Sequence, residues 1–213
     1  MTREAKHRCV LLLILLLCLS TRLSSQNDEE WNWINEHFGP ALSELMPIQQ
    51  SSGFYVAYRS HRDYQTSILE YSFVIGYDPN ENGPGLQEYL SAHVRIADSL
   101  SIHDQMMKMH SSNPQEDAAN IQKQVKLKTW DFTQKTCPAI QRQFDKFQVL
   151  RFGTPVFDQI VFHPLVHTFH IQAGMGNMDL VLTDEGHPLV KWALETRHAL
   201  EACTASSKST KQN

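Results

Sequence analysis

The segment FDQIVFHPLVHTFHIQAGMG (residues 157–176) combines β-branched and aromatic residues with three histidines and ends in a glycine-rich turn. This composition predicts a β-strand from about residue 156 to 173, broken at Pro164. A turn at 174–177 would join it to MDLVLT (178–183), which makes the segment the first arm of a C-terminal hairpin. Because side chains alternate between the faces of a strand, we expect His163 and His167 to share one face and His170 to lie on the other.

Three earlier segments, 53–59, 67–77 and 87–97, are also rich in strand-forming residues. The third alternates apolar residues such as Leu90 and Val94 with polar residues such as His93 and Arg95. A short polar link and a loop of Asp, Pro, Asn and Gly at 78–85 separate the three segments. Their succession predicts a three-stranded antiparallel meander.

Helical periodicity, with apolar residues three and four positions apart, marks the remaining segments. We predict helices at about 29–38, 99–110, 115–126, from 136 onward and 184–203. Gly39 and Pro40 are expected to end the first helix, leaving only a short turn at 40–46. The chain should therefore adopt an α+β fold, in which an antiparallel sheet of a three-stranded meander plus a C-terminal hairpin carries helices packed mainly on one face.

The N-terminus has the pattern of a secretory signal peptide, with basic residues, an apolar run from Cys9 to Leu19 and then small polar residues. The run is shorter than the about 20 apolar residues that a membrane-spanning helix needs. We expect residues 1–25 to be a signal peptide, 26–203 a single domain and 204–213 a disordered polar tail. The mature protein would be secreted or periplasmic without a membrane span, and an uncleaved N-terminal anchor is the alternative.

The net charge and the cysteine content indicate which partners and which cellular compartment to expect. Loss of residues 1–25 would remove four basic residues and one acidic residue, which changes the net charge from −4 to about −7. An acidic chain without a basic patch argues against nucleic acid as a partner. Of the four cysteines, Cys137 and Cys203 would remain, and an even pair in an oxidising compartment is expected to form a disulfide.

Two groups of residues have the chemistry of metal ligands. The first group comprises His103, Met106, Met107 and His110. The last three follow His103 by three, four and seven positions, which places all four side chains on one stripe of a helix. Its thioether and imidazole donors suit copper. The second group, His163 and His167 with His93 on a neighbouring strand, offers donors for zinc. The competing interpretations are core packing for the helical stripe and an exposed sheet face for the strand histidines.

A third candidate site is a sheet face that carries tyrosine and arginine, two residue types enriched in recognition surfaces. It draws on Tyr55, Tyr58, Arg59, Tyr64, Tyr71, Tyr89 and Arg95, and we expect Tyr58, Tyr71, Tyr89 and Arg95 to bind the ligand. The alternative is that these tyrosines are ordinary strand residues whose hydroxyl groups reach solvent.

The sequence lacks the GxSxG, P-loop and HExxH motifs and a complete dinucleotide-binding fingerprint, which lowers the expectation of an enzyme. We therefore expect a non-enzymatic exported module that binds a small ligand or a protein, without a cofactor. The alternative is a metal-binding protein that uses copper on the helical stripe or zinc on the strand histidines, or a metal-dependent hydrolase.

Overall fold

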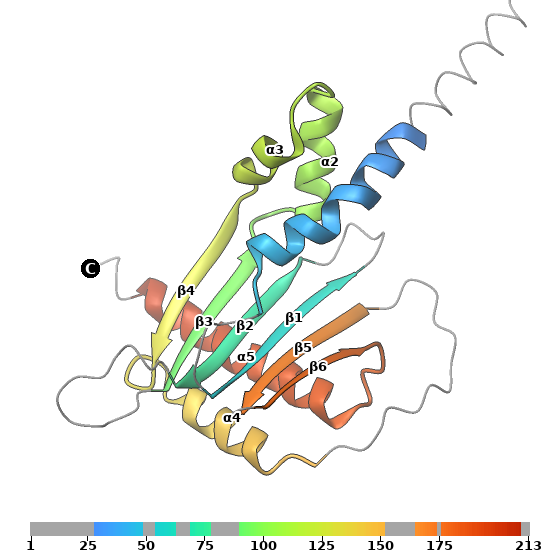
Figure 1. The fold of residues 1–213 in the computed structure, drawn as a ribbon. Helices are drawn as coiled ribbons and strands as arrows, with labels where there is room; N and C mark the ends of the chain where they lie inside the picture. The colour runs from blue at the N-terminus through green and yellow to red at the C-terminus, as the bar shows by residue number, and fades with distance from the viewer. Residues whose placement is uncertain are drawn as a thin grey trace, which may run out of the picture.

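The computed structural model describes residues 28–48, 54–62, 69–77, 90–151, 165–173 and 176–209. Their strands form one antiparallel sheet in the order β4-β3-β2-β1-β5-β6 (Figure 1). The strands are β1 (Tyr55–Arg62), β2 (Tyr71–Tyr77), β3 (Leu90–Ala97), β4 (Leu127–Thr133), β5 (Leu165–Ala173) and β6 (Gly176–Leu182). The predicted α+β class is confirmed, and β1 lies at the centre because it pairs with both β2 and β5.

Five of the six strands correspond to predicted segments, with the meander as β1, β2 and β3 and the C-terminal hairpin as β5 and β6. The sequence-based prediction missed β4, which pairs with β3 and forms one edge of the sheet. Most side chains of LKTWDFT remain exposed or half-buried, and only Phe132 is buried. An edge strand buries few side chains, so it lacks the strong apolar signal of a central strand. The predicted loop at 78–85, the turn at 174–175 and the strand residues before 165 lie outside the described residues.

Two helices cover one face of the sheet, α4 (Ala139–Gln148) and α5 (Pro188–Ser209). The core between them contains Phe73 from the sheet, whose ring lies 5.8 Å from that of Trp192, and Phe147, at 5.0 Å from the same indole. The indole N–H of Trp192 donates to the Gln143 carbonyl at 2.8 Å, so the two helices are joined by a buried polar contact as well as by apolar packing.

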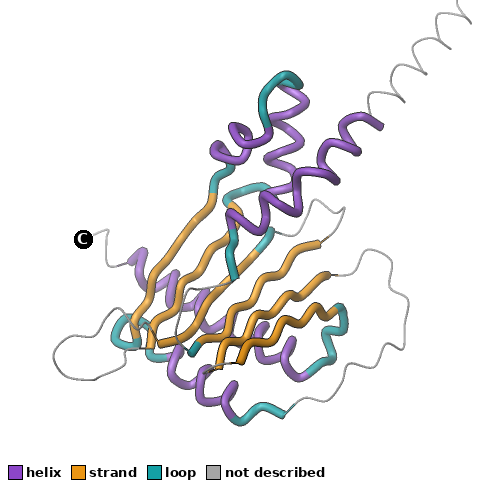
Figure 2. Tube along the Cα trace, viewed as in Figure 1, coloured by secondary structure: helices purple, strands orange, loops and turns teal. Residues whose placement is uncertain are grey.

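The other helical group lies at one end of the sheet and consists of an N-terminal helix (residues 28–45), α2 (Ile102–Ser112) and α3 (Ala118–Gln124), as Figure 2 shows. These helices share a second core that includes Ile34, Leu42 and Met106. The N-terminal helix lies against the face opposite α4 and α5, where Arg59 and Arg95 donate to carbonyl groups at its C-terminal end. The helices that cover the sheet, α4 and α5, thus lie on one face as predicted, and the N-terminal helix contacts the opposite face at its C-terminal end.

The N-terminal helix continues through Gly39 and Pro40, where the sequence predicted an end. Pro40 removes one hydrogen bond from the helix, and its ring disfavours helical geometry in the residue before it. Gly39 has no Cβ to meet that ring, which relieves much of the conflict. Ile34 and Leu42, which are buried on either side of Gly39 and Pro40, belong to the same core, and their packing keeps the helix continuous.

The predicted disulfide between Cys137 and Cys203 is present and connects the chain two residues before α4 to α5. Helix α5 continues to Ser209, so residues 204–209, predicted as part of a disordered tail, are helical. It begins at Pro188 rather than at the predicted residue 184, and His187 caps it, because the Leu189 N–H donates to His187 Nδ1 at 3.2 Å.

The signal peptide predicted for residues 1–25 lies outside the described residues. In the part of the chain that is described, no helix has the length and apolar character to cross a membrane.

Candidate functional site

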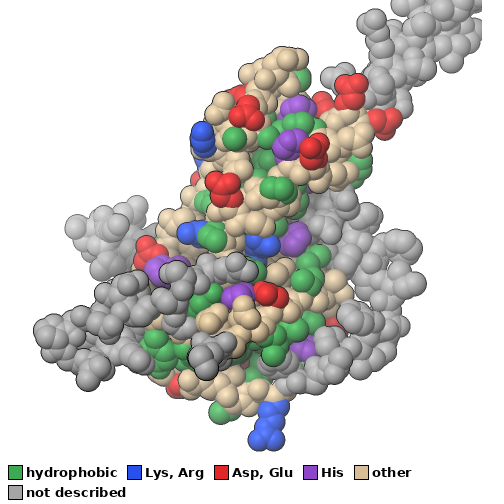
Figure 3. All heavy atoms as spheres, in the orientation of Figure 1, with side chains coloured by type: hydrophobic (Ala, Val, Ile, Leu, Met, Phe, Trp, Pro, Cys, Tyr) green, Lys and Arg blue, Asp and Glu red, His purple; other side chains and the backbone are tan. Residues whose placement is uncertain are grey.

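A cavity of about 400 Å³ lies between the N-terminal helix, β1 and the start of α2. The helix contributes its apolar side chains, Ile34, Phe38 and Leu42. The sheet and α2 contribute polar groups, Arg59, His61 and His103. Asn35, Gly39 and Ser43 complete the lining. Figure 3 shows histidine side chains beside hydrophobic ones where the N-terminal helix meets α2.

Arg59 reaches the cavity because it points away from Tyr58 and the main core. Its Nη1 donates to the carbonyl oxygens of Leu42 and Met46, both at 3.3 Å. These carbonyls belong to the end of a helix, where backbone acceptors lack helical partners and a positive charge is favourable. Burial lowers the pKa of the Arg59 guanidinium, and its Nε is buried without a hydrogen-bond partner.

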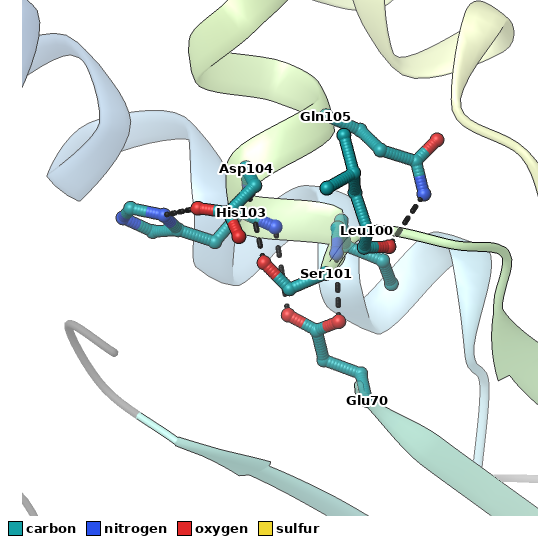
Figure 4. Close-up of polar contacts among 7 residues, drawn as sticks. Glu70, Leu100, Ser101, His103, Asp104 and Gln105 are labelled. Atoms are coloured by element: carbon teal, nitrogen blue, oxygen red, sulfur yellow. Dashed lines mark hydrogen bonds and ion pairs between the residues drawn. The ribbon is translucent and has the colours of Figure 1, made fainter. Parts of the chain in front are cut away.

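Glu70 fixes the start of α2 and thereby the position of His103 (Figure 4). Its carboxylate accepts the Ile102 N–H at 2.7 Å and the His103 N–H at 3.5 Å. A carboxylate is well placed at a helix N-terminus, and Ser101 adds a side-chain cap by accepting the Asp104 N–H at 3.0 Å. Burial nevertheless raises the pKa of the Glu70 carboxyl, although the backbone hydrogen bonds counteract this effect.

The predicted copper stripe on α2 faces the N-terminal helix. Met106 is fully buried in the second core, which fits the competing interpretation of core packing. His103 lines the cavity, and its ring lies edge-on to that of Phe38 at 5.6 Å. At the other end of the stripe, His110 stacks on the indole of Trp33 with ring centroids 4.1 Å apart. Met107 is partly buried against the same core.

Within the described ranges, no group of three or more His, Cys, Asp or Glu side chains is arranged to hold a metal ion. Copper binding by the helical stripe stays a prediction, and elemental analysis after exposure to copper and desalting would test it. His163, one of the histidines predicted to bind zinc, lies outside the described residues.

His167, the other predicted zinc ligand, faces the main core. Its Nδ1 lies 2.8 Å from Tyr58 Oη, and its side chain is fully buried. His170 points to the opposite face of the sheet, where its Nδ1–H donates to Asp179 Oδ1 at 2.6 Å. The prediction that His167 and His170 lie on opposite faces of the sheet is therefore confirmed.

The structure does not bring the predicted tyrosine and arginine surface together. Tyr58 and Tyr71 are fully buried on the core side of the sheet, whereas Arg95 lies on the other side, where its Nη1 donates to the Leu45 carbonyl at 3.3 Å. The two tyrosines face α4 and α5 because those helices cover the face that the sequence had suggested for solvent. Tyr89 lies outside the described residues.

His93 belongs to a row of directly opposed residues that crosses all six strands. From β4 to β6 the row reads Asp131, His93, Val74, Ala57, His170 and Asp179. Each histidine donates through Nδ1 to the aspartate on the adjacent edge strand, in both cases at 2.6 Å. Three strand spacings separate the histidines, about 14 Å, so they are too far apart to share one metal ion.

Of the polar residues that line the cavity, sequence reasoning named His103 as a possible copper ligand and Arg59 as part of the tyrosine and arginine face, but it did not bring them together and it missed His61. Arg59 and His61 are two positions apart on a strand, which places both on the same face, and this spacing was the available signal. No family model, curated protein or solved structure matches this chain.

Proposed function

We propose that this protein is an exported, non-enzymatic binding protein that holds a small molecule in the cavity between the N-terminal helix, β1 and α2. The observation that carries the proposal is the distribution of the lining, with apolar side chains from one element and an arginine and two histidines from the other two. A volume of about 400 Å³ lies within the range of small-molecule sites, about 300 to 1,000 Å³.

The attachment of the helix supports a preformed site. Arg59 and Arg95, on β1 and β3, both donate to carbonyl groups at the end of the N-terminal helix. The helix and α2 also share the core residues Ile34, Leu42 and Met106. A wall that is already fixed does not need to be ordered when the ligand binds, and this preorganisation favours affinity.

A thermal-shift screen of small amphiphilic molecules tests the proposal. Ser43 lines the cavity and is exposed, so Ser43→Phe should obstruct it. Asn32→Phe is the matched control, because Asn32 is an exposed polar residue of the same helix that does not line the cavity. A ligand at one hundred times its Kd should raise the melting temperature by about 5 to 10 °C.

The expected result is that such ligands stabilise the unaltered protein and Asn32→Phe but not Ser43→Phe. If every stabilising ligand acts equally on all three proteins, or if the screen yields none, the cavity is not the binding site that we propose.

A further inference from the structure

Among the described residues that line the cavity, Arg59 carries a permanent positive charge, whereas the others are apolar, neutral polar or histidine. None of the ion pairs within the described residues includes this arginine. The carboxylate of Glu70 does not line the cavity and is occupied by the first N–H groups of α2. Arg59 is partly buried and has helix carbonyls but no carboxylate as partners, so an anion in the cavity would supply the counter-charge that this guanidinium lacks.

His103 adds a second unsatisfied group to the same cavity. The residue is 8% exposed, and neither ring nitrogen makes a hydrogen bond. Its Nδ1 lies 3.5 Å from Asp104 Oδ1, an approach that Figure 4 marks. Apart from this ion-pair contact the imidazole is unsatisfied, and in particular Nε2 is buried without a hydrogen bond, which is uncommon for a buried polar atom. Arg59 Nε and His103 Nε2 are thus two buried polar atoms of cavity-lining residues that have no hydrogen-bond partner.

The rest of the lining limits the shape of the ligand. Ile34, Phe38 and Leu42 offer apolar surface but no charged group. A volume of about 400 Å³ corresponds to roughly 13 water molecules at about 30 Å³ each, and hence to a ligand of about ten non-hydrogen atoms. The ligand should therefore have one anionic end and a short apolar body.

We propose that the cavity binds a medium-chain carboxylate, whose carboxylate group accepts hydrogen bonds from Arg59 and His103 while its alkyl chain packs against the N-terminal helix. This inference rests on the proposed function, because it names the ligand class of the same cavity. A guanidinium fork matches a carboxylate, and such charge-assisted hydrogen bonds are stronger than those between neutral groups.

Calorimetric titration of the unaltered protein with octanoate, 1-octanol, octylamine and octyl phosphate tests the ligand class directly. The expected result is that octanoate binds at least tenfold more tightly than octanol and that octylamine binds more weakly than either. Equal affinity for octanoate and octanol would refute the anion preference while leaving the proposed function intact. Tighter binding of octyl phosphate would refute the choice of a carboxylate. If no eight-carbon ligand binds although the screen finds others, this inference alone fails.

Substitution of the two arginines separates ligand binding from helix attachment. Arg59→Gln and Arg95→Gln each remove a donor to the end of the N-terminal helix, but only Arg59 lines the cavity. Arg59→Gln should abolish the tenfold preference for octanoate over octanol, and Arg95→Gln should preserve it. His103→Gln should reduce the preference severalfold. Retention of the full preference in Arg59→Gln would overturn the assignment, and the ligand comparison on the unaltered protein decides the matter if that variant does not fold.

Discussion

Replacement of His167 by glutamine should make the stability of this protein less sensitive to acid. The His167 side chain is fully buried, and burial, with a smaller contribution from His61, lowers its pKa from 6.5 to about 4. Burial also raises the pKa of Tyr58 to about 12, so the tyrosine stays protonated and donates to His167 Nδ1. A glutamine carbonyl can accept the same hydrogen bond without titrating.

The sign and size of the effect follow from the two pKa values of this imidazole. Between pH 6.5 and about 4, the unfolded chain binds a proton at His167 and the native protein does not. The free energy of unfolding therefore falls as the pH falls through this window, by about 1.4 kcal/mol per pH unit. Across the whole window, His167 should account for a loss of about 3 kcal/mol.

Urea unfolding followed by tryptophan fluorescence at pH 7.0, 6.0, 5.0 and 4.5 measures this loss. His167→Gln should lose about 2 to 3 kcal/mol less than the unaltered protein between pH 7.0 and 4.5. His198→Gln, on the exposed surface of α5 with a side chain 78% exposed, is the control and should follow the unaltered protein. Parallel curves for all three proteins would refute the explanation, because they would show that His167 is protonated equally in the native and unfolded states.

Three further changes test the fold. Glu70→Ala should destabilise the protein by about 1 to 3 kcal/mol, because it leaves buried N–H groups at the start of α2 unpaired; urea unfolding measures this loss, and a neutral effect contradicts the capping role. The Cys137→Ser, Cys203→Ser double variant should lose about 4 kcal/mol of its free energy of unfolding, because the disulfide closes a loop with a sequence separation of 66 residues. Urea denaturation of both proteins under the same conditions measures this loss, and a difference below about 1 kcal/mol would refute the estimate. Gly39→Ala should destabilise the protein by roughly 1 kcal/mol when Pro40 is present, but stabilise it by about 0.5 to 1 kcal/mol in a Pro40→Ala background. Thermal denaturation measures both changes, and the same sign of the stability change in both backgrounds would contradict the explanation that Gly39 accommodates the Pro40 ring.

The elements that the sequence predicted well are those in which local pattern and final burial agree. In β3, Leu90, Ala92 and Val94 alternate with half-buried polar residues, and the same alternation appears in the structure. The alternation of side chains along β5 likewise predicted that His167 and His170 lie on opposite faces. These features depend on the geometry of a single strand and need no knowledge of what packs against it.

The elements that the sequence predicted poorly depend on partners far along the chain. The N-terminal helix passes through Gly39 and Pro40 because its buried residues pack on α2, a contact that local propensity does not include. The tyrosines assigned to a binding face are buried for the same reason, since α4 and α5 cover that side of the sheet. The cavity itself has walls from three separated segments, so its existence had no local signature.

The position of Asp179 has a consequence for self-association. Strand β6 is an edge of the sheet, and its exposed Met178 and Val181 would favour the addition of another strand. Asp179 is the middle residue of β6 (Gly176–Leu182), so full antiparallel pairing of β6 with its copy in a second molecule would set the two Asp179 residues opposite each other. Like charges in directly opposed positions destabilise a strand pair. The carboxylate that His170 holds in place thus opposes symmetric growth of the sheet from one molecule into the next.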